Sequence, residues 1–331
     1  MRVPKVIITR TPLRITLGGG GTDLPSYYEK FGGLVISAAI SKYIYIHINQ
    51  TFTPDYFLKY SALERTQTVE EIQHPIIREV LHAHDIGPNL EIVSVADIPA
   101  GTGLGSSGSF TVGLLRAVYA HQRYHVTAGN VAEEACRIEI DRLDRPVGKQ
   151  DQYIAAFGGL TSFTFLPDGS VEASPLRISM ETLHDLEERL LLFFTGYSRD
   201  ADDVLEDQRG RTEGGDSQML DNLHYVKELG LRSRSALEDG DTPRFAELMH
   251  EHWQHKRNRS AGMSNARIDR LYEEGIDNGA SGGKLVGAGG GGFLMFYAND
   301  PSRLRRSMAS RGLTEVRFVF DHDGSTPIVR A

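Results

Sequence analysis

Hydrophobic and polar residues follow one another along this chain with spacings that predict both strands and helices. The stretch SKYIYIHIN at 41–49 alternates isoleucine with polar or aromatic residues, so we expect a strand with one buried face. The segment NLEIVSVAD at 89–97 predicts another strand, and HPIIREVLHAHD at 74–85 has the four-residue spacing of a helix. A half-buried sheet therefore begins early in the chain.

The loop IPAGTGLGSSGSF at 98–110 follows the second of these strands and contains four glycines and three serines. Beyond it, Phe110, Leu114 and Val118 fall four residues apart, which predicts one face of a helix. Glycines let backbone N–H groups approach phosphate oxygens, and the positive end of a helix dipole attracts anions. The loop is therefore expected to bind phosphate at a helix N-terminus. A glycine turn with a serine helix cap is the alternative.

The rest of the chain mixes strands and helices without a regular strand–helix repeat. A second helix is expected over about 130–143, and a hairpin over 158–176 with its turn at the Pro-Asp-Gly sequence 167–169. The charged, glycine-rich stretch 198–217 predicts a mobile surface segment suited to a lid.

Helical patterns continue to about residue 278, and the segments GGFLMFYAND at 291–300 and EVRFVFD at 315–321 are expected to close the chain as strands. This irregular mixture predicts an α+β fold rather than a doubly wound sheet.

Composition narrows the class of protein. With 331 residues and 40% hydrophobic content, the chain can bury a full core in about two domains. The formal charge of −8 has the wrong sign for a nucleic-acid or membrane partner, so a phosphate site must be local. Cys136 is the single cysteine, which excludes an intrachain disulfide. Without a signal-like or membrane-spanning run, we expect a cytoplasmic protein.

Two common types of phosphate loop do not fit the sequence. Gly103, Gly105 and Gly108 match the dinucleotide fingerprint, but the segment that should hold its second strand has helical spacing. The Walker pattern is absent. Two further glycine clusters occur, LGGGGTD at 17–23 and GAGGGGF at 287–293, and three such clusters in one chain are hard to explain as turns.

The stretches PLRITLGGGGTD, IPAGTGLGSSGS and KLVGAGGGGF resemble, in order, the three motifs of the GHMP small-molecule kinases. The resemblance implies an N-terminal domain of the ribosomal-protein S5 domain-2 type over 1–180, a ferredoxin-like C-terminal domain over 181–331, and an active site between them. It also implies ATP and Mg²⁺ as cofactors. The residues expected to bind the nucleotide are Pro99, Gly101, Gly103, Leu104, Gly105, Ser106, Ser107, Gly108 and Ser109.

Within this family, the stretches at 18–33, 148–159 and 278–293 are most similar to kinases of D-glycero-D-manno-heptose 7-phosphate. The resemblance implies a small-molecule sugar phosphate as substrate, phosphorylated at its anomeric hydroxyl. Another sugar kinase, such as a fucokinase, and a non-catalytic nucleotide or sugar-phosphate sensor remain alternatives. The oligomeric state, monomer or homodimer, is left open.

Glu139 falls on an otherwise apolar stripe of the expected second helix, together with Ala132, Ala135 and Cys136. A buried carboxylate needs a cation, and the spacing alone fits an ion pair with Arg142 or another base equally well. The resemblance implies that Glu139 holds Mg²⁺ together with Ser107.

Three residues are expected to be catalytic. By resemblance, Asp151 is the base or orients the attacking hydroxyl, and Arg14 stabilises charge near that hydroxyl. Lys149 could hold Asp151 ionised or touch the transferred phosphoryl group, and a surface lysine is the alternative.

The first and third glycine clusters supply most of the expected substrate contacts. Gly20 stands where galactokinase has a glutamate, which leaves room for a bulkier or anionic substrate. The run Lys256, Arg257 and Arg259 is typical of a solvated helix face but also suits a second phosphate site. The histidines before it lack the H-E-x-x-H spacing of a zinc site. The full expected substrate set is Gly20, Gly21, Thr22, Asp23, Lys256, Gly289 and Gly290.

Overall fold

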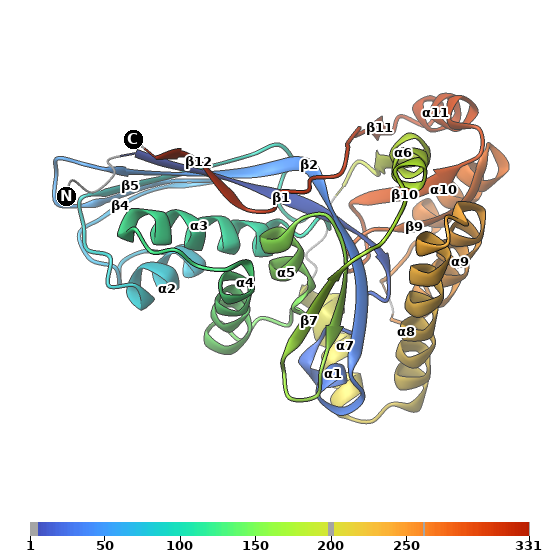
Figure 1. Ribbon diagram of the computed structural model, residues 1–331, viewed down its shortest axis with the longest axis horizontal. Coiled ribbons are helices and arrows are strands. Elements are labelled where there is room, and N and C mark those ends of the chain that lie inside the picture. The colour runs from blue at the N-terminus through green and yellow to red at the C-terminus, as the bar shows by residue number, and fades with distance from the viewer. Residues whose placement is uncertain (1–5, 198–201, 261, 331) are drawn as a thin grey trace.

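The computed structural model describes residues 6–197, 202–260 and 262–330. Two β-sheets organise this part of the chain, and helices pack against each of them (Figure 1). The larger sheet has eight strands and the smaller has four. Helices and strands follow one another irregularly, which confirms the expected α+β class.

The first half of the chain builds most of the eight-stranded sheet and the helices beneath it. The strands of this sheet are β1 (Val6–Gly18), β2 (Gly33–Gln50), β3 (Tyr56–Lys59), β4 (Leu63–Thr66), β5 (Leu90–Ala96), β6 (Leu160–Phe165), β7 (Val171–Pro175) and β12 (Thr326–Arg330). The helices of this half are α1 (Pro25–Phe31), α2 (Pro75–Ala83), α3 (Ser106–Gln122), α4 (Ala128–Cys136), the π-helical turn η1 (Arg137–Arg142) and α5 (Gln150–Phe157).

The long strand β2 pairs antiparallel with β1, β5 and β6 and forms the centre of this sheet. Ile44, Ile46 and Ile48 are buried, as their alternation predicts. Helix α3 lies along the sheet on the same side as α2 and α4 (Figure 1). The backbone N–H of Arg14 on β1 donates to the carbonyl of Leu104, 3.0 Å away, so the glycine loop before α3 is held against the sheet.

The second half of the chain builds the four-stranded sheet. Its elements are α6 (Met180–Arg189), β8 (Leu190–Phe194), α7 (Asp202–Glu213), α8 (Ser217–Glu238), α9 (Thr242–Lys256), α10 (Ala266–Asp277), β9 (Ala280–Leu285), β10 (Phe293–Ala298), α11 (Pro301–Ser310) and β11 (Thr314–Glu315). Strand β9 lies so close to α9 that a Cβ on Gly282 would sit 1.9 Å from the carbonyl oxygen of Ala246. None of the helices in the described ranges combines the length and apolar character needed to cross a membrane.

The chain returns to the first sheet at its end, because β12 pairs antiparallel with β1 and both termini lie at the same end of the molecule (Figure 1). A single division at residue 180 therefore does not describe the sheets, although the expected domains 1–180 and 181–331 stay a prediction.

One expectation about the second half is wrong, and the mobility expected of residues 198–217 stays a prediction. Residues 202–213, expected as part of a mobile surface segment, form helix α7, in which Val204, Gln208 and Thr212 are buried. Residues 198–201 of that segment lie outside the described residues. Only Glu315 of the expected strand 315–321 belongs to a strand, because the chain there turns from one sheet to the other. The expected elements 41–49, 74–85, 89–97 and 291–300 and the hairpin 158–176 are confirmed.

Candidate active site

A cavity of about 690 Å³ is lined by residues of both sheets and of all three glycine clusters. One end is apolar, and its walls come from β2, β5 and α2 and the segments that flank them. The opposite end is polar and charged, and its walls come from β1, β9, α7 and α9. The apolar residues at the first end include Ile44, Tyr60, Ile76, Ala96, Ile98 and Phe110. Such a slot suits a flat aromatic ring, with polar groups beyond it.

The central glycine loop lies between these ends. Gly101, Gly103 and Gly105 have φ values of +75°, +84° and +77°, a region that side-chain-bearing residues avoid. Helix α3 starts directly after Gly105, and within the described ranges its N-terminus has no side-chain cap. Ser106 Oγ faces the cavity and is buried without a hydrogen-bond partner in the described structure. Uncapped amides and an unpartnered hydroxyl fit a bound phosphate and argue against the simple serine cap.

The predicted nucleotide-binding residues divide into two groups. Five of them line the cavity: Gly101, Gly103, Gly105, Ser106 and Ser107. Pro99, Leu104, Gly108 and Ser109 are not among the described residues that line it, and their part in nucleotide binding stays a prediction.

The side chains of the second group serve the fold. The hydroxyl of Ser109 donates to the carbonyl of Pro12 at 2.7 Å. Leu104 is buried in the core.

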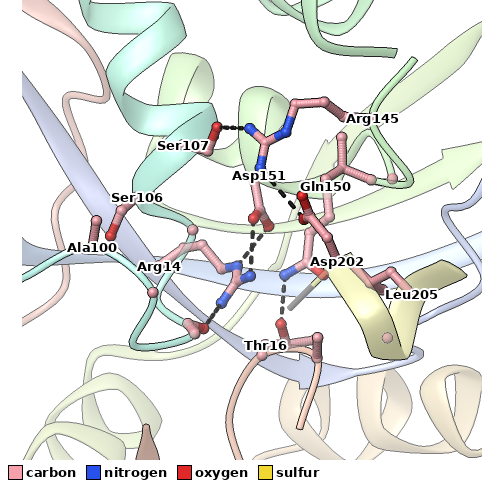
Figure 2. Close-up of a pocket in the computed structure, with 18 of the residues that line it drawn as sticks. Arg14, Thr16, Ala100, Ser106, Ser107, Arg145, Gln150, Asp151, Asp202 and Leu205 are labelled. Carbon is pink, nitrogen blue, oxygen red and sulfur yellow. Dashed lines mark hydrogen bonds and ion pairs between the residues drawn. The ribbon is translucent and has the colours of Figure 1, made fainter. Parts of the chain in front are cut away.

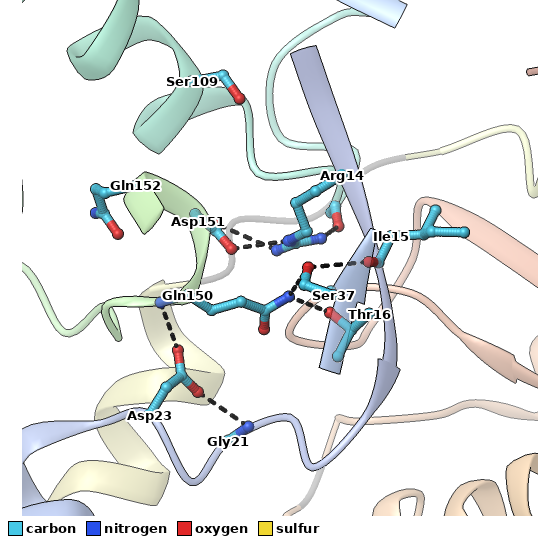
Figure 3. A network of polar contacts seen from close by, with 12 residues as sticks. Arg14, Ile15, Thr16, Gly21, Asp23, Ser37, Ser109, Gln150, Asp151 and Gln152 are labelled. Atoms are coloured by element: carbon cyan, nitrogen blue, oxygen red, sulfur yellow. Dashed lines mark hydrogen bonds and ion pairs between the residues drawn. The ribbon is translucent and has the colours of Figure 1, made fainter. Parts of the chain in front are cut away.

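Arg14 and Asp151 form a two-pronged ion pair inside the cavity (Figures 2 and 3). Arg14 Nε lies 2.7 Å from Asp151 Oδ1, and Nη2 lies 3.0 Å from Oδ2. Arg14 Nη1 also donates to the carbonyl of Gly103 at 2.5 Å, so the pair is tied to the glycine loop. Asp151 stands in the first turn of α5 and Arg14 on β1. The structure therefore brings together a cation, a carboxylate and the phosphate loop, as the sequence predicted.

Gln150 connects Asp23 to the centre of the sheet, a role that sequence reasoning missed (Figure 3). Its backbone N–H donates to Asp23 Oδ2 at 3.2 Å, and its Nε2 donates to the hydroxyls of Thr16 and Ser37 at 2.5 and 3.0 Å. Burial and the charge of Asp151 raise the pKa of Asp23. The stretch GKQDQY contains Gln150, but only its charged residues Lys149 and Asp151 were predicted to belong to the site.

Four of the seven predicted substrate residues line the cavity, namely Gly20, Gly21, Asp23 and Lys256. Thr22 is not among the lining residues, and its hydroxyl donates to the carbonyls of Gly19 and Leu34, both at 2.8 Å. Gly289 and Gly290 pack against Met263, which lines the cavity, and the substrate contacts of these three residues stay a prediction. Their neighbours Gly287 and Ala288 line it instead.

Glu139 lies in η1, where the predicted second helix widens into a π-helical turn. Its carboxylate is fully buried and accepts hydrogen bonds from Ser107 Oγ, Thr111 Oγ1 (3.0 Å) and Gln152 Nε2 (3.0 Å). Arg145 Nη1 lies 2.8 Å from Glu139 Oε2 and supplies the positive charge (Figure 2 shows Arg145 beside Ser107).

Burial raises the pKa of Glu139, and the hydrogen bond from Ser107, the charge of Arg145 and the other two hydrogen bonds oppose this rise. The expected partner Arg142 lies instead 3.8 Å from Glu79.

Lys149 is the predicted catalytic residue that the structure places elsewhere. Its Nζ lies 3.0 Å from Glu133 Oε1 and donates to the carbonyl of Gly169 at 2.8 Å. It does not line the cavity. In this structure the lysine joins the turn of the β6–β7 hairpin to α4, and its contact with Asp151 or with the phosphoryl group stays a prediction.

The charged end of the cavity corrects the expectation of a solvated helix face. Lys256 and Arg259 are 8% and 4% exposed and line the cavity. Lys284 and His252, which sequence reasoning missed, are 2% and 3% exposed and line it as well. In the described ranges no three histidine, cysteine or acidic side chains gather as a metal site.

Comparisons with known proteins agree with this arrangement. The family model for the GHMP kinases N terminal domain matches residues 69–159, and the model for the GHMP kinases C terminal matches residues 233–313. The D-glycero-alpha-D-manno-heptose 7-phosphate kinase of Campylobacter jejuni subsp. jejuni serotype O:2 is 32% identical over 313 residues, which are 90% of this chain and 91% of that protein.

Two solved structures share the fold over nearly the whole length. A putative sugar kinase from Campylobacter jejuni has a TM-score of 0.76 at 28% identity, and the match covers 99% of this chain and 100% of that one. A D-glycero-D-manno-heptose 1-phosphate kinase from Bacteroides thetaiotaomicron has a TM-score of 0.79 at 24% identity, covering 98% and 99%. The chain therefore belongs to the GHMP kinase family and is a phosphotransferase with a hydroxyl group as acceptor.

Proposed function

We propose that this protein is an ATP-dependent kinase that phosphorylates the anomeric hydroxyl of D-glycero-D-manno-heptose 7-phosphate to give the 1,7-bisphosphate. The observation that carries the proposal is the Arg14–Asp151 pair, held beside the uncapped N-terminus of α3. The heptose 7-phosphate kinase of Campylobacter jejuni, similar along most of both chains, supports the choice of sugar.

The cavity offers a separate place for each part of this reaction. The apolar end suits the base of the nucleotide, and the amide groups of the glycine loop suit its phosphates. The acceptor hydroxyl then lies at Asp151, which orients it and takes its proton. A bond forms between that oxygen and the γ-phosphorus, the bond to the β–γ bridging oxygen breaks, and ADP leaves. Arg14 stabilises the charge on the transferring group.

Ser107 and Glu139 are the residues that would hold Mg²⁺. When bound, the ion neutralises charge on the phosphate oxygens. One hydroxyl and one carboxylate do not enclose such an ion, but Mg²⁺ in kinase sites keeps waters and takes phosphate oxygens as further ligands. The contact of Ser107 Oγ with Glu139 Oε2 places two oxygen ligands side by side, which fits an ion carried in with the nucleotide.

A substrate panel tests the proposal. The purified protein is assayed with ATP and Mg²⁺ against heptose 7-phosphate, free heptose, galactose, fucose and mevalonate, and the phosphorylated position is identified by ³¹P NMR. We expect the highest kcat/KM for heptose 7-phosphate and a product phosphorylated at the anomeric oxygen. A higher kcat/KM for fucose or galactose would reject the heptose assignment, and no turnover on any acceptor would favour a non-catalytic sensor.

A further inference from the structure

Three buried cations at the charged end of the cavity have no carboxylate partner in the described part of the chain. Lys256 donates to the carbonyls of Leu285 (3.1 Å) and Gly287. Arg259 donates to Asn222 Oδ1 at 2.9 Å and more weakly to the carbonyl of Gly20 at 3.3 Å. All of these acceptors are neutral. Buried charges in proteins are normally paired, so an anion is missing from this end.

Lys284 is the most informative of the three. It lies on β9, is 2% exposed and lines the cavity, and its Nζ takes part in none of the hydrogen bonds and ion pairs found among the described residues. His252 Nε2, from the same end of the cavity, is also buried without a partner. Two unsatisfied polar groups that face one space indicate a ligand that accepts hydrogen bonds from both.

The mutual repulsion of Lys256, Arg259 and Lys284 also indicates that an anion binds between them. The charges of Lys284 and Arg259 add to burial in lowering the pKa of Lys256, and those of Arg14 and Arg259 do so for Lys284. The charge of Asp23 favours the charged form of Arg259 but does not outweigh the effect of burial. A phosphate monoester carries up to two negative charges and several acceptor oxygens, which match an excess of cations over carboxylates.

We propose that Lys256, Arg259 and Lys284 bind the phosphate that the acceptor already carries, so that this cluster selects phosphorylated over free sugars. The inference rests on the proposed function and adds the residues that set substrate class. The phosphates of the nucleotide already have a proposed site in the glycine loop before α3. Arg259, by contrast, donates to the carbonyl of Gly20, and the charge of Asp23 favours its charged form, so it lies on the proposed acceptor side. The cluster therefore serves the second ligand.

Binding measured without catalysis tests this assignment. Isothermal titration compares heptose 7-phosphate, free heptose and a non-hydrolysable ATP analogue on the wild type, Lys284→Met and Arg259→Gln. A lost charge-assisted contact costs about tenfold to a hundredfold in affinity. We expect that loss for the sugar phosphate only, with less than about twofold change for the free sugar and the analogue. Lys227→Met is the control for the loss of a lysine charge, because Lys227 is not among the residues that line the cavity and donates to the carbonyls of Phe31 and Gly32.

The outcomes separate this proposal from the proposed function. If both variants weaken the ATP analogue and spare the sugar phosphate, the cluster belongs to the nucleotide and the inference is wrong, while the kinase assignment stands. If heptose 7-phosphate is not a substrate, a panel of other sugar phosphates and inorganic phosphate still tests the cluster. Tighter binding of a phosphorylated than of a free sugar, lost in both variants, supports it, and equal binding by the wild type overturns it. Thermal melting verifies that each variant is folded, and Arg259→Gln carries the test if Lys284→Met does not fold.

Discussion

Arg145 places its guanidinium on Glu139, with Nη1 2.8 Å from Oε2, and also donates to Ser107 Oγ. The two side chains that we propose as Mg²⁺ ligands are thus held by an arginine. Arg145 is partly exposed at the edge of the cavity, whereas Glu139 is fully buried. Loading of the metal therefore requires this guanidinium to give up its contact with the carboxylate.

Replacement of Arg145 by methionine should lower the Mg²⁺ concentration needed for half-maximal nucleotide binding by about threefold or more, because the competing cation is gone. Glu139→Gln should raise it by about tenfold or more, because a ligand charge is lost. Binding of a fluorescent, non-hydrolysable ATP analogue is titrated with Mg²⁺. Arg142→Met is the matched control, since Arg142 pairs with Glu79 instead. Unchanged Mg²⁺ curves for both variants would remove Glu139 from the metal site.

Asp151→Asn should reduce kcat by about 10²- to 10⁴-fold and leave affinity for the ATP analogue nearly unchanged, because an amide fills the same space but takes no proton. Single-turnover kinetics and analogue titration measure the two effects. Asp168→Asn in the β6–β7 turn is the control, because its contact with Ser170 is available to asparagine as well. Turnover within threefold of the wild type would show that Asp151 is not needed for chemistry.

Gly108→Ala should destabilise the protein, although alanine normally favours a helix by about 1 kcal/mol over glycine. A Cβ at this position would lie 2.7 Å from Asp151 Cβ, so α3 and α5 would have to separate. Gly129→Ala in α4 is the matched control, where the nearest atom to the new Cβ is 3.8 Å away. We expect a loss of about 1–3 kcal/mol for the first change and a small gain for the second, measured by urea unfolding. The same response at both sites would contradict the close approach.

Lys284→Met should make the ligand-free protein more stable near neutral pH. Burial and the charges of Arg14 and Arg259 lower the pKa of Lys284 to about 7, and Lys256 and His252 also face this end of the cavity. Since an unfolded lysine titrates near pH 10.4, the unfolded chain binds more protons between these values, and wild-type stability rises there by at most about 1.4 kcal/mol per pH unit.

The gap between variant and wild type should therefore be largest at or below pH 7 and shrink toward pH 10. Urea unfolding of both proteins at several pH values measures it. Saturating sugar phosphate should stabilise the wild type more than the variant. A gap that does not change with pH would show that Lys284 is not titrating in this range.

Local patterns predicted the parts of the site that depend on neighbours in sequence. The glycine loop opens a helix, and the spacing that placed Glu139 on an apolar stripe correctly implied burial and a cation. Lys284 was missed because it is a single charged residue far along the chain, and only the packing of α9 against β9 buries it near Lys256. Lysine and arginine are normally exposed, so burial of this kind leaves no local signal.

Helix α7 and strand β12 were not predicted for a similar reason, because both depend on contacts with distant parts of the chain. The polar stretch 202–213 has little apolar character of its own, and it becomes a helix because Val204, Gln208 and Thr212 are covered by other parts of the fold. Strand β12 gains its partner from β1, about 320 residues earlier, so local sequence does not reveal it.

Strand β2 also sets the distance between the two ends of the cavity, where we propose that nucleotide and acceptor bind. Ile44 lies in the wall of the apolar end, and seven residues earlier the hydroxyl of Ser37 accepts from Gln150, which holds Asp23 at the other end. Seven strand residues span roughly 20 Å, and the register of β2 against β1 shifts once within this stretch, where Pro12 pairs with Tyr43 and Leu13 with Ile40. Deletion of one residue from the regularly paired part of the stretch would turn the following side chains to the opposite face and move the two proposed ligand sites relative to each other. The strand, rather than the loops at either mouth of the cavity, therefore sets the spacing between the two proposed ligands.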